Sequence, residues 1–209
     1  MEVYVHGVKR PQKERHSDNV MPMDSDDRAE KGVKIPEERK AVVIGRAGTT
    51  KNEIEAKTRT RINIGDAIVI RGDPLDVMVA AQIITAIGRG FPPVAALKLL
   101  DETQTLHIMN LPEKGLERIR ARVIGTRGKA RRRIERATKT RLCVYGKTVS
   151  VIGEHEGVEL AVKALDRLIS GSPHKNAYRA IRKIKSDDRG KDSARNGSNA
   201  ERDIDKRVL

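Results

Sequence analysis

The chain has 209 residues, enough for one large domain or two small ones, and its 37% of apolar residues allow only modest cores. Lys and Arg number 43 against 29 Asp and Glu, a formal net charge of +14 that favours a polyanionic partner, nucleic acid above all. The chain has no Trp, one Phe and three Tyr. This scarcity excludes the aromatic platforms on which RNA-recognition motifs and OB folds stack bases. A charge-rich surface of a heat-adapted protein is the alternative explanation of the composition, although it requires no such excess of one sign.

The sequence contains few residues suited to catalysis or metal binding. A single cysteine, Cys143, excludes an intrachain disulfide and a cysteine-cluster zinc site, and its apolar surroundings indicate a buried strand thiol. The five histidines are scattered without metal-ligand spacing. We therefore predict a protein that is not an enzyme and needs no cofactor or metal. No apolar run approaches the roughly 20 residues that span a bilayer, so we expect a soluble, cytoplasmic protein.

The first part of the chain predicts an arm followed by a folded unit. Residues 1–31 are polar and aperiodic, apart from a candidate strand at 3–5, and we expect a flexible arm. We expect the first domain over 32–91. Its elements follow from hydrophobic periodicity, caps and turns: a strand at 33–35, helices at 37–44 and 49–58, strands at 61–64 and 67–70, and a long helix that begins at Asp73 or Pro74.

The second part predicts the same order again. Residues 92–103 form a linker with a short helix over 94–100, and a second domain covers 104–171. Its expected elements match those of the first: a strand at 105–111, a helix at 112–124, a helix at 129–138, strands at 141–145 and 148–152, and a helix at 158–169. A basic C-terminal helix over 172–185, with its helical pattern from 176, and a disordered tail over 186–209 complete the chain.

A pentapeptide of the form Ile-Gly-X-X-Gly occurs twice, 80 residues apart, at 44–48 and at 124–128. The flanking residues keep the same spacing, since Ile54-Glu55 matches Ile134-Glu135 and the stretch 58–62 matches 138–142. A constant offset over so many positions indicates that one structural unit has been duplicated. A glycine-bounded basic loop that opens a helix brings bare backbone amides and cationic side chains close to phosphates.

The order of elements together with this loop resembles the KH domain in its eukaryotic-type (type I) arrangement. The resemblance implies an α+β fold of two tandem KH domains, each a three-stranded sheet covered by three helices. It also implies a groove for about four single-stranded nucleotides between the GxxG loop with its flanking helices and the second strand. The expected RNA-binding residues of the second domain are Gly125, Thr126, Arg127, Gly128, Lys129, Arg131, Arg132, Ile134, Leu142 and Val144, and those of the first are Gly45, Arg46, Ala47 and Gly48.

Within this set the expected roles differ. The glycines allow close approach of the RNA backbone, and the hydroxyl and cationic groups bind phosphates. Ile134, Leu142 and Val144 are expected to line the floor under the bases, with a core position as the alternative for Ile134. Many KH domains have an apolar residue three positions after the loop, whereas Lys51 and Arg131 stand there in this chain.

The two repeats carry different charge. Residues 34–61 contain 8 Lys and Arg against 4 Glu, a net charge of +4. The equivalent residues 114–141 contain 12 Lys and Arg against 2 Glu, a net charge of +10. A solvated helix face is the alternative explanation of such a run. We predict that the second domain binds RNA more strongly and that the first is weaker or mainly structural.

A closer resemblance lies in the second repeat. The stretch 128–141, with Gly171-Ser172-Pro173 and Tyr178 after it, is similar to the tandem-KH ribosome-assembly family of archaea and eukaryotes, the Dim or partner-of-Nob family. The resemblance implies binding near the 3′ end of 16S rRNA during small-subunit maturation. It implies the Nob endonuclease and the α subunit of translation initiation factor two as partners. The intact first GxxG favours an archaeal type. A general KH-type mRNA-binding regulator or a subunit of an RNA-processing complex stays open as the alternative.

Overall fold

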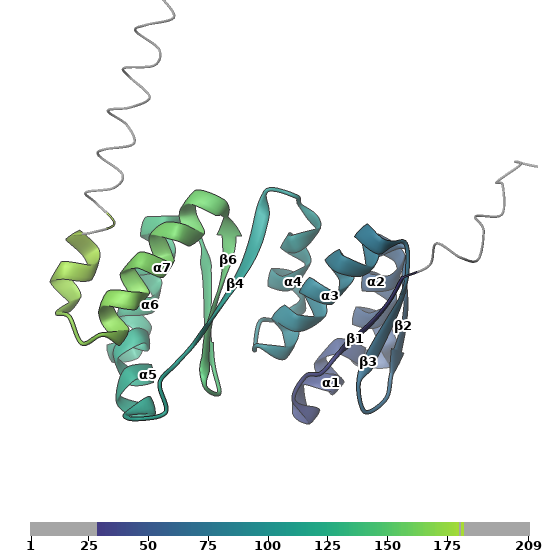
Figure 1. Ribbon diagram of the computed structural model, residues 1–209, viewed down its shortest axis with the longest axis horizontal. Helices are drawn as coiled ribbons and strands as arrows, with labels where there is room; N and C mark the ends of the chain where they lie inside the picture. Colours follow the sequence, from purple (N-terminus) through teal and green to yellow (C-terminus); the bar gives the residue numbers. More distant parts are fainter. Residues whose placement is uncertain (1–28, 180, 182–209) are drawn as a thin grey trace, which may run out of the picture.

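The computed structural model describes residues 29–179 and residue 181. Residues 1–28, the greater part of the arm predicted over 1–31 with its candidate strand at 3–5, lie outside the described residues, as do residues 182–209 with the predicted tail. Two units of one architecture follow each other along the described chain (Figure 1).

Both units run in the order strand, helix, glycine loop, helix, strand, strand, helix. The first consists of β1 (Ala29–Val33), α1 (Glu37–Ile44), the 3-10 turn η1 (Arg46–Gly48), α2 (Thr49–Thr58), β2 (Arg61–Ile64), β3 (Ile68–Gly72) and α3 (Pro74–Gly88). After α4 (Pro93–Ala96) and η2 (Leu97–Leu100), the second consists of β4 (Gln104–Asn110), α5 (Leu116–Ile124), η3 (Thr126–Gly128), α6 (Lys129–Thr138), β5 (Arg141–Tyr145), β6 (Thr148–Glu154) and α7 (His155–Ile169).

Each unit contains an antiparallel three-stranded sheet with its last strand in the middle, in the orders β1-β3-β2 and β4-β6-β5. The hairpin of the second unit is one residue longer than that of the first. Ile64 pairs with Ile68, four residues later, whereas the equivalent Val144 pairs with Val149, five residues later. The offset between the repeats is therefore 80 residues before this turn and 81 after it. The helices cover one face of each sheet (Figure 1). The predicted α+β fold of two tandem KH units is confirmed.

The duplicated apolar residues form two equivalent cores. Ile54 and Ile134 are fully buried on the second helix of each unit, and Ile70 and Leu165 are equally enclosed. Burying an aliphatic side chain of this size contributes about 1.5–3 kcal/mol. The match between Ile54 and Ile134 is therefore explained by the apolar stripe of the second helix, which faces the core, and not by the glycine loop before it.

The bounds of α1, α2, α6, β2 and β5 agree with the predictions, and the ends of β3, β4, β6 and α7 differ from them by one to three residues. The first strand and α5 correct the predictions more clearly. The first strand covers 29–33 instead of 33–35, because it is an edge strand defined by pairing with β3, Ala29 opposite Gly72. Its exposed residues Glu30, Lys31 and Gly32 hide the alternation that marks a strand. In the second unit α5 begins at Leu116 instead of Pro112, because Gly115 precedes it with a left-handed φ of 77°.

The two units stack with the sheet of the second against the segment that joins them (Figure 1). Residues 148–153 of β6 are all buried, because α7 packs against one face of this central strand and the core of the first unit packs against the other. Ile152 belongs to the core of the first unit, and Leu106 and Cys143 pack against the same core. The central strand of the second sheet is thus enclosed on both faces, whereas β3, the central strand of the first, has buried, half-buried and exposed positions.

Arg39 joins the first helix to this junction. Its Nε donates to the Ile87 carbonyl at 2.8 Å and its Nη2 to the Phe91 carbonyl at 2.8 Å, so one guanidinium holds the end of α3 and the start of the joining segment. The same guanidinium lies 5.8 Å from the ring of Tyr145, whose hydroxyl donates to Glu38 at 2.5 Å.

The chain beyond α7 is helical over 174–179, two residues earlier than the predicted start. Ala177 and Ile181 are buried in the second core, so this helix is an addition to the second unit. Arg133 lies 4.0 Å from the ring centre of Tyr178, within the range of a cation–π interaction. Over 29–179, none of the helices has both the length and the apolar character needed to cross a membrane.

Candidate nucleic-acid interface

The two glycine loops have the same backbone geometry. Gly45 and Gly125 have φ, ψ of 72°, 178° and 70°, 171°, a region that only glycine occupies readily. Ala47 and Arg127 are left-handed at φ 51° and 50°. The near-identity of these angles shows that both repeats retain an intact loop in front of the second helix.

The two glycines of each loop have different requirements. A Cβ on Gly125 would lie 2.6 Å from the Cβ of Ala130 and 2.9 Å from its amide nitrogen, so no other residue fits there. A Cβ on Gly128 would meet nothing nearer than the Arg132 Nη1 at 3.3 Å. The first glycine therefore serves the loop's packing, and the second leaves the surface open to a ligand.

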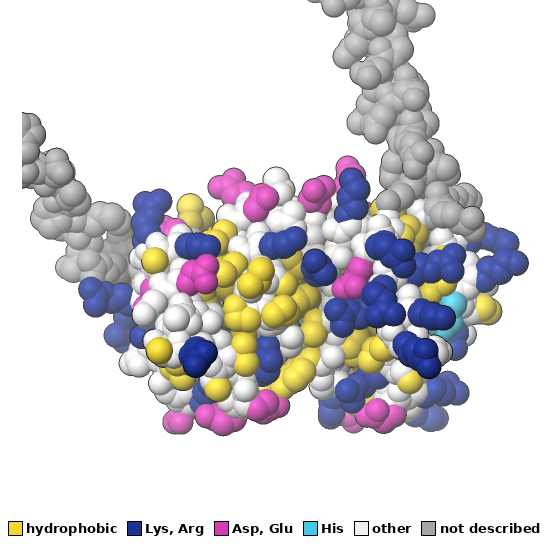
Figure 2. Space-filling view, turned by 180° about the vertical axis from the view of Figure 1, so that it is seen from behind, with side chains coloured by type: hydrophobic (Ala, Val, Ile, Leu, Met, Phe, Trp, Pro, Cys, Tyr) yellow, Lys and Arg dark blue, Asp and Glu magenta, His cyan; other side chains and the backbone are white. Residues whose placement is uncertain are grey.

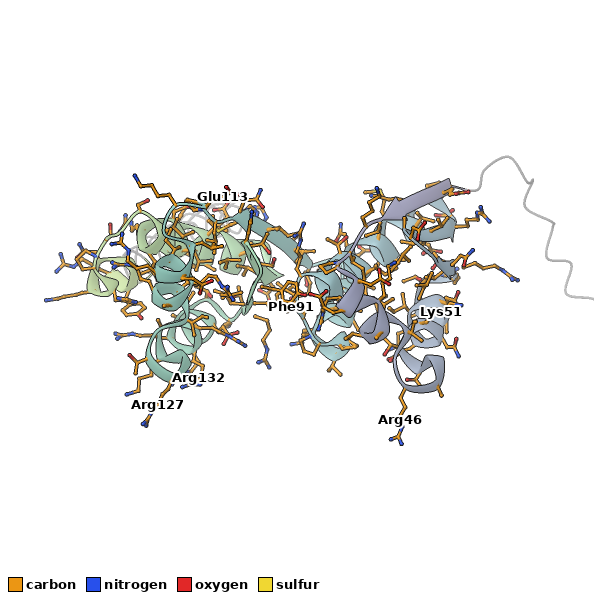
Figure 3. The ribbon with its side chains drawn as sticks, turned by 90° about the horizontal axis from the view of Figure 1, so that it is seen from below. Arg46, Lys51, Phe91, Glu113, Arg127 and Arg132 are labelled. Atoms are coloured by element: carbon orange, nitrogen blue, oxygen red, sulfur yellow. The ribbon has the colours of Figure 1, made fainter. Side chains whose placement is uncertain are left out.

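The polar and cationic residues of the loops are exposed. Thr126, Arg127 and Lys129 face solvent in the second unit, and Arg46 and Ala47 do so in the first. Figure 3 shows Arg46 and Arg127 projecting from the same side of the molecule. The N-terminal ends of the α2 and α6 helix dipoles add partial positive charge behind each loop.

Arg132 turns back over its own loop. Its Nη2 donates to the Arg127 carbonyl at 2.5 Å, which fixes the guanidinium beside Gly128. Together with Lys129, Arg133 and Arg136 it lines a shallow basic hollow on the outer side of α6. Figure 2 shows Lys and Arg gathered over this second unit. Such a concentration of one sign attracts a phosphate chain.

One carboxylate in each unit fastens the second helix to the edge strand. Glu55 Oε1 accepts from the Ile62 amide at 2.6 Å, and Glu135 Oε1 accepts from the Leu142 amide at 2.9 Å. Glu135 also lies 3.3 Å from the Arg131 Nε. Each acid therefore sets the spacing between the two walls of its groove, which are α2 and β2 in the first unit and α6 and β5 in the second. The sequence signal was present in the matched Ile-Glu pairs, although it did not disclose this role.

The predicted apolar floor is partly wrong. Ile134 is fully buried, so its side chain belongs to the core and does not reach the groove. Leu142 is 1% exposed and belongs to the same core, and it also lines the pocket between α6 and β5. Val144 is half-buried and packs against the same core. The reason is the helical stripe of α6, which must face the sheet to bury its apolar residues. The predicted set thus divides into exposed loop and helix residues, which the fold brings together, and core residues beneath them.

The described residues contain no group of three or more His, Cys, Asp or Glu side chains placed to hold a metal ion. Cys143 lies at the groove edge, and burial raises the pKa of its thiol. A thiol with a raised pKa is neutral near pH 7 and a weak nucleophile.

Two open grooves, each with a GxxG loop, a helix start and an edge strand, define a tandem KH protein of the nucleic-acid-binding class. Comparison with known proteins agrees. A family described as the eukaryotic-type KH domain (KH domain type I) matches residues 102–186, and the KH domain family matches 30–86.

Relatives of known sequence and structure narrow the class. A KH domain-containing protein of Methanocaldococcus jannaschii is 37% identical over 161 residues, 71% of each chain. The pre-rRNA-processing protein PNO1 of Chaetomium thermophilum is 28% identical over 145 residues, 62% of this chain and 56% of that one. Dim2p of Pyrococcus horikoshii, in a complex with a/eIF2α and rRNA, is 43% identical with a TM-score of 0.73, over 77% of this chain and 96% of that one. The chain belongs to the archaeal tandem-KH ribosome-assembly family of Dim2p and PNO1.

Proposed function

We propose that this protein binds single-stranded RNA near the 3′ end of 16S rRNA and acts in the cytoplasm in the maturation of the small ribosomal subunit, without catalysing a reaction. The observation that carries the proposal is the duplicated loop. Two glycine-bounded turns of equal geometry hold exposed cations beside a groove, in a chain whose relatives process pre-rRNA or bind rRNA. A KH groove binds by its backbone amides, cations and aliphatic contacts, which suits a chain so poor in aromatic residues.

The second unit is the stronger RNA-binding unit in this proposal. Its loop and second helix expose Arg127, Lys129 and Arg131, where the first unit exposes Arg46 and half-buries Lys51. The charge difference between the two windows supports the same order, since phosphate contacts provide most of the affinity for single strands.

Two protein partners belong to the proposal. The Pyrococcus horikoshii relative was solved together with a/eIF2α and rRNA, and we expect this chain to bind the α subunit of translation initiation factor two as well. The Nob endonuclease is the second expected partner, because the resemblance to the partner-of-Nob family implies it.

The test replaces the open glycine of each loop. Gly128→Asp and Gly48→Asp keep the fold, because a Cβ at either position meets only the end of a flexible side chain, that of Arg132 or Asn52, and Asp tolerates left-handed backbone better than most residues. Each places a carboxylate where phosphate is expected. We expect Gly128→Asp to weaken binding of a short 16S 3′-end RNA at least about tenfold, and Gly48→Asp to weaken it less. Equal losses contradict the asymmetry.

Gly115→Asp is the matched control. This glycine is also left-handed with nothing within 4 Å of a Cβ, and it lies at the opposite end of α5 from the loop. Gly115→Asp adds the same charge and a similar backbone strain as Gly128→Asp, but away from the glycine loop. The affinity of this control variant for RNA should therefore stay at the wild-type value. A general mRNA regulator is distinguished by crosslinking and sequencing of bound RNA in cells, where reads without a peak at the 16S 3′ end argue against the assembly role.

A further inference from the structure

The space between the second helix and the edge strand is present in both units but has different walls. Equivalent residues line it in each: Lys51, Glu55, Arg61, Ile62 and Asn63 in the first unit, and Arg131, Glu135, Arg141, Leu142 and Cys143 in the second. The first is otherwise bordered by its own strand β3, through Val69 and Arg71. The second has an additional wall that the repeat does not contain.

That wall is the segment joining the two units. Residues from Gly90 to Lys98 border the second pocket, which encloses about 360 Å³. Gly90 makes the approach possible, because a Cβ there would lie 2.9 Å from the Cys143 Sγ and 3.0 Å from the Tyr145 Cβ. Phe91 is only 2% exposed, and its side chain anchors the segment between the units (Figure 3).

The exposed part of this wall is apolar. Val94 is 79% exposed although its neighbours Ala96 and Leu99 are buried, and Pro92 is exposed beside it. Figure 2 shows an apolar surface in the middle of the molecule, flanked by the cations of the second unit. KH domains commonly place an apolar residue three positions after the loop, where this chain has Arg131. In this chain the joining segment provides apolar surface to the same groove.

The rim of the pocket is cationic. Lys98, Arg131 and Arg141 are exposed around it, and Glu135 is the one acid among its lining residues. The Glu135 carboxylate already accepts from the Leu142 amide and is only 12% exposed. An apolar surface within a positive rim is complementary to a nucleotide, whose base is flat and apolar on its faces and whose phosphate is an anion.

We propose that the joining segment forms a third wall of the second groove and holds one further nucleotide of the bound RNA, with its base against Pro92 and Val94 and its phosphate between Lys98 and Arg131. The inference rests on the proposed RNA binding and adds a subsite to it. The first groove has no such wall, so the subsite exists once in the chain and lies on the side of the second groove that faces the first unit.

The test uses the full chain and a fluorescein-labelled 12-nucleotide RNA of the 16S 3′-end sequence, followed by anisotropy. Val94→Asp and Lys98→Glu should each weaken binding by about five- to tenfold, because one apolar contact or one phosphate contact is lost. Two controls make equal changes elsewhere. Leu75→Asp alters a side chain 73% exposed on α3, and Lys163→Glu alters an exposed lysine on α7. Both should stay within about twofold of wild type.

The Gly128→Asp variant distinguishes a failure of the proposed RNA binding from a failure of the proposed third wall. If it abolishes binding while Val94→Asp and Lys98→Glu match their controls, RNA binding stands and the third wall is overturned. If it leaves binding intact, the proposed function itself fails. A loss of affinity for a protein partner with unchanged affinity for RNA also overturns the third wall. Photo-crosslinking from a 4-thiouridine-substituted RNA should place a crosslinked nucleotide within residues 90–98, and crosslinks confined to 124–145 contradict it.

Discussion

Removing the guanidinium of Arg39 should loosen the junction between the units. This group donates at 2.8 Å to each of two carbonyls, those of Ile87 and Phe91, near the end of α3. A hydrogen bond from a charged group contributes about 1.5–3 kcal/mol when partly buried, and its loss leaves two acceptors unpaired. Arg39→Met keeps the aliphatic stem and removes both bonds. We expect it to lower the free energy of unfolding by about 2–4 kcal/mol.

The assay is urea denaturation followed by circular dichroism, with hydrogen exchange to locate the change. Arg71→Met is the matched control, because Arg71 forms an exposed ion pair with Glu30 at 2.8 Å, a type worth about 0–1 kcal/mol. Exchange should rise at 86–99 in Arg39→Met and stay unchanged there in the control. Equal destabilisation by the two variants, or faster exchange spread evenly over the chain, would refute a local clamp.

Three further outcomes follow from the geometry. Gly125→Ala should cost about 3 kcal/mol or more and Gly128→Ala about 1 kcal/mol in the same denaturation assay, because only the first meets atoms closer than 3 Å. The Tyr145 hydroxyl lowers the pKa of Glu38, and the Glu38 carboxylate raises the pKa of Tyr145. Their bond should therefore weaken as the pH falls through the lowered Glu38 pKa and again as it rises through the raised Tyr145 pKa. Carboxyl NMR and tyrosinate absorbance measure these two limits, and Tyr145→Phe should move the pKa of Glu38 back toward its ordinary value. Finally, log affinity for RNA should fall with log salt at a slope near about −3 if about four phosphates are bound, and a flat response contradicts phosphate binding.

The elements with local signals were predictable from sequence. The bounds of α1, α2 and α6 follow from glycine loops and apolar stripes that act within a few residues. The loop residues Thr126 and Arg127 were placed correctly at the surface because a turn must expose its polar residues.

Contacts between distant residues were not predictable. The strand at 29–33 depends on pairing with β3, about 40 residues away in the chain, and carries almost no apolar pattern. For the site, Ile134 shows what sequence reasoning could not predict. The apolar positions of α6 recur with the helical period whether they face the core or the groove, so the period did not show that Ile134 is buried in the core. The apolar wall of Pro92 and Val94 had no counterpart in the other repeat, so the comparison of repeats offered no sign of it.

The unequal burial of the two central strands gives a second reason, beside charge, to expect unequal RNA binding. After the one-residue shift at the hairpin, Arg71 of the first unit corresponds to Ile152 of the second. An arginine on the outer face keeps the first sheet in water, whereas the isoleucine is 1% exposed against the joining segment.

This substitution affects the groove through its edge strand. Each edge strand is held by its central strand and by the glutamate of the second helix, and β5 is held in addition by its close approach to Gly90. A wall that is already fixed loses less freedom when a ligand binds, so more of the contact energy appears as affinity. The advantage that we expect for the second groove then has two parts of different origin. The part that comes from charge decreases with salt, and the part that comes from a fixed β5 does not.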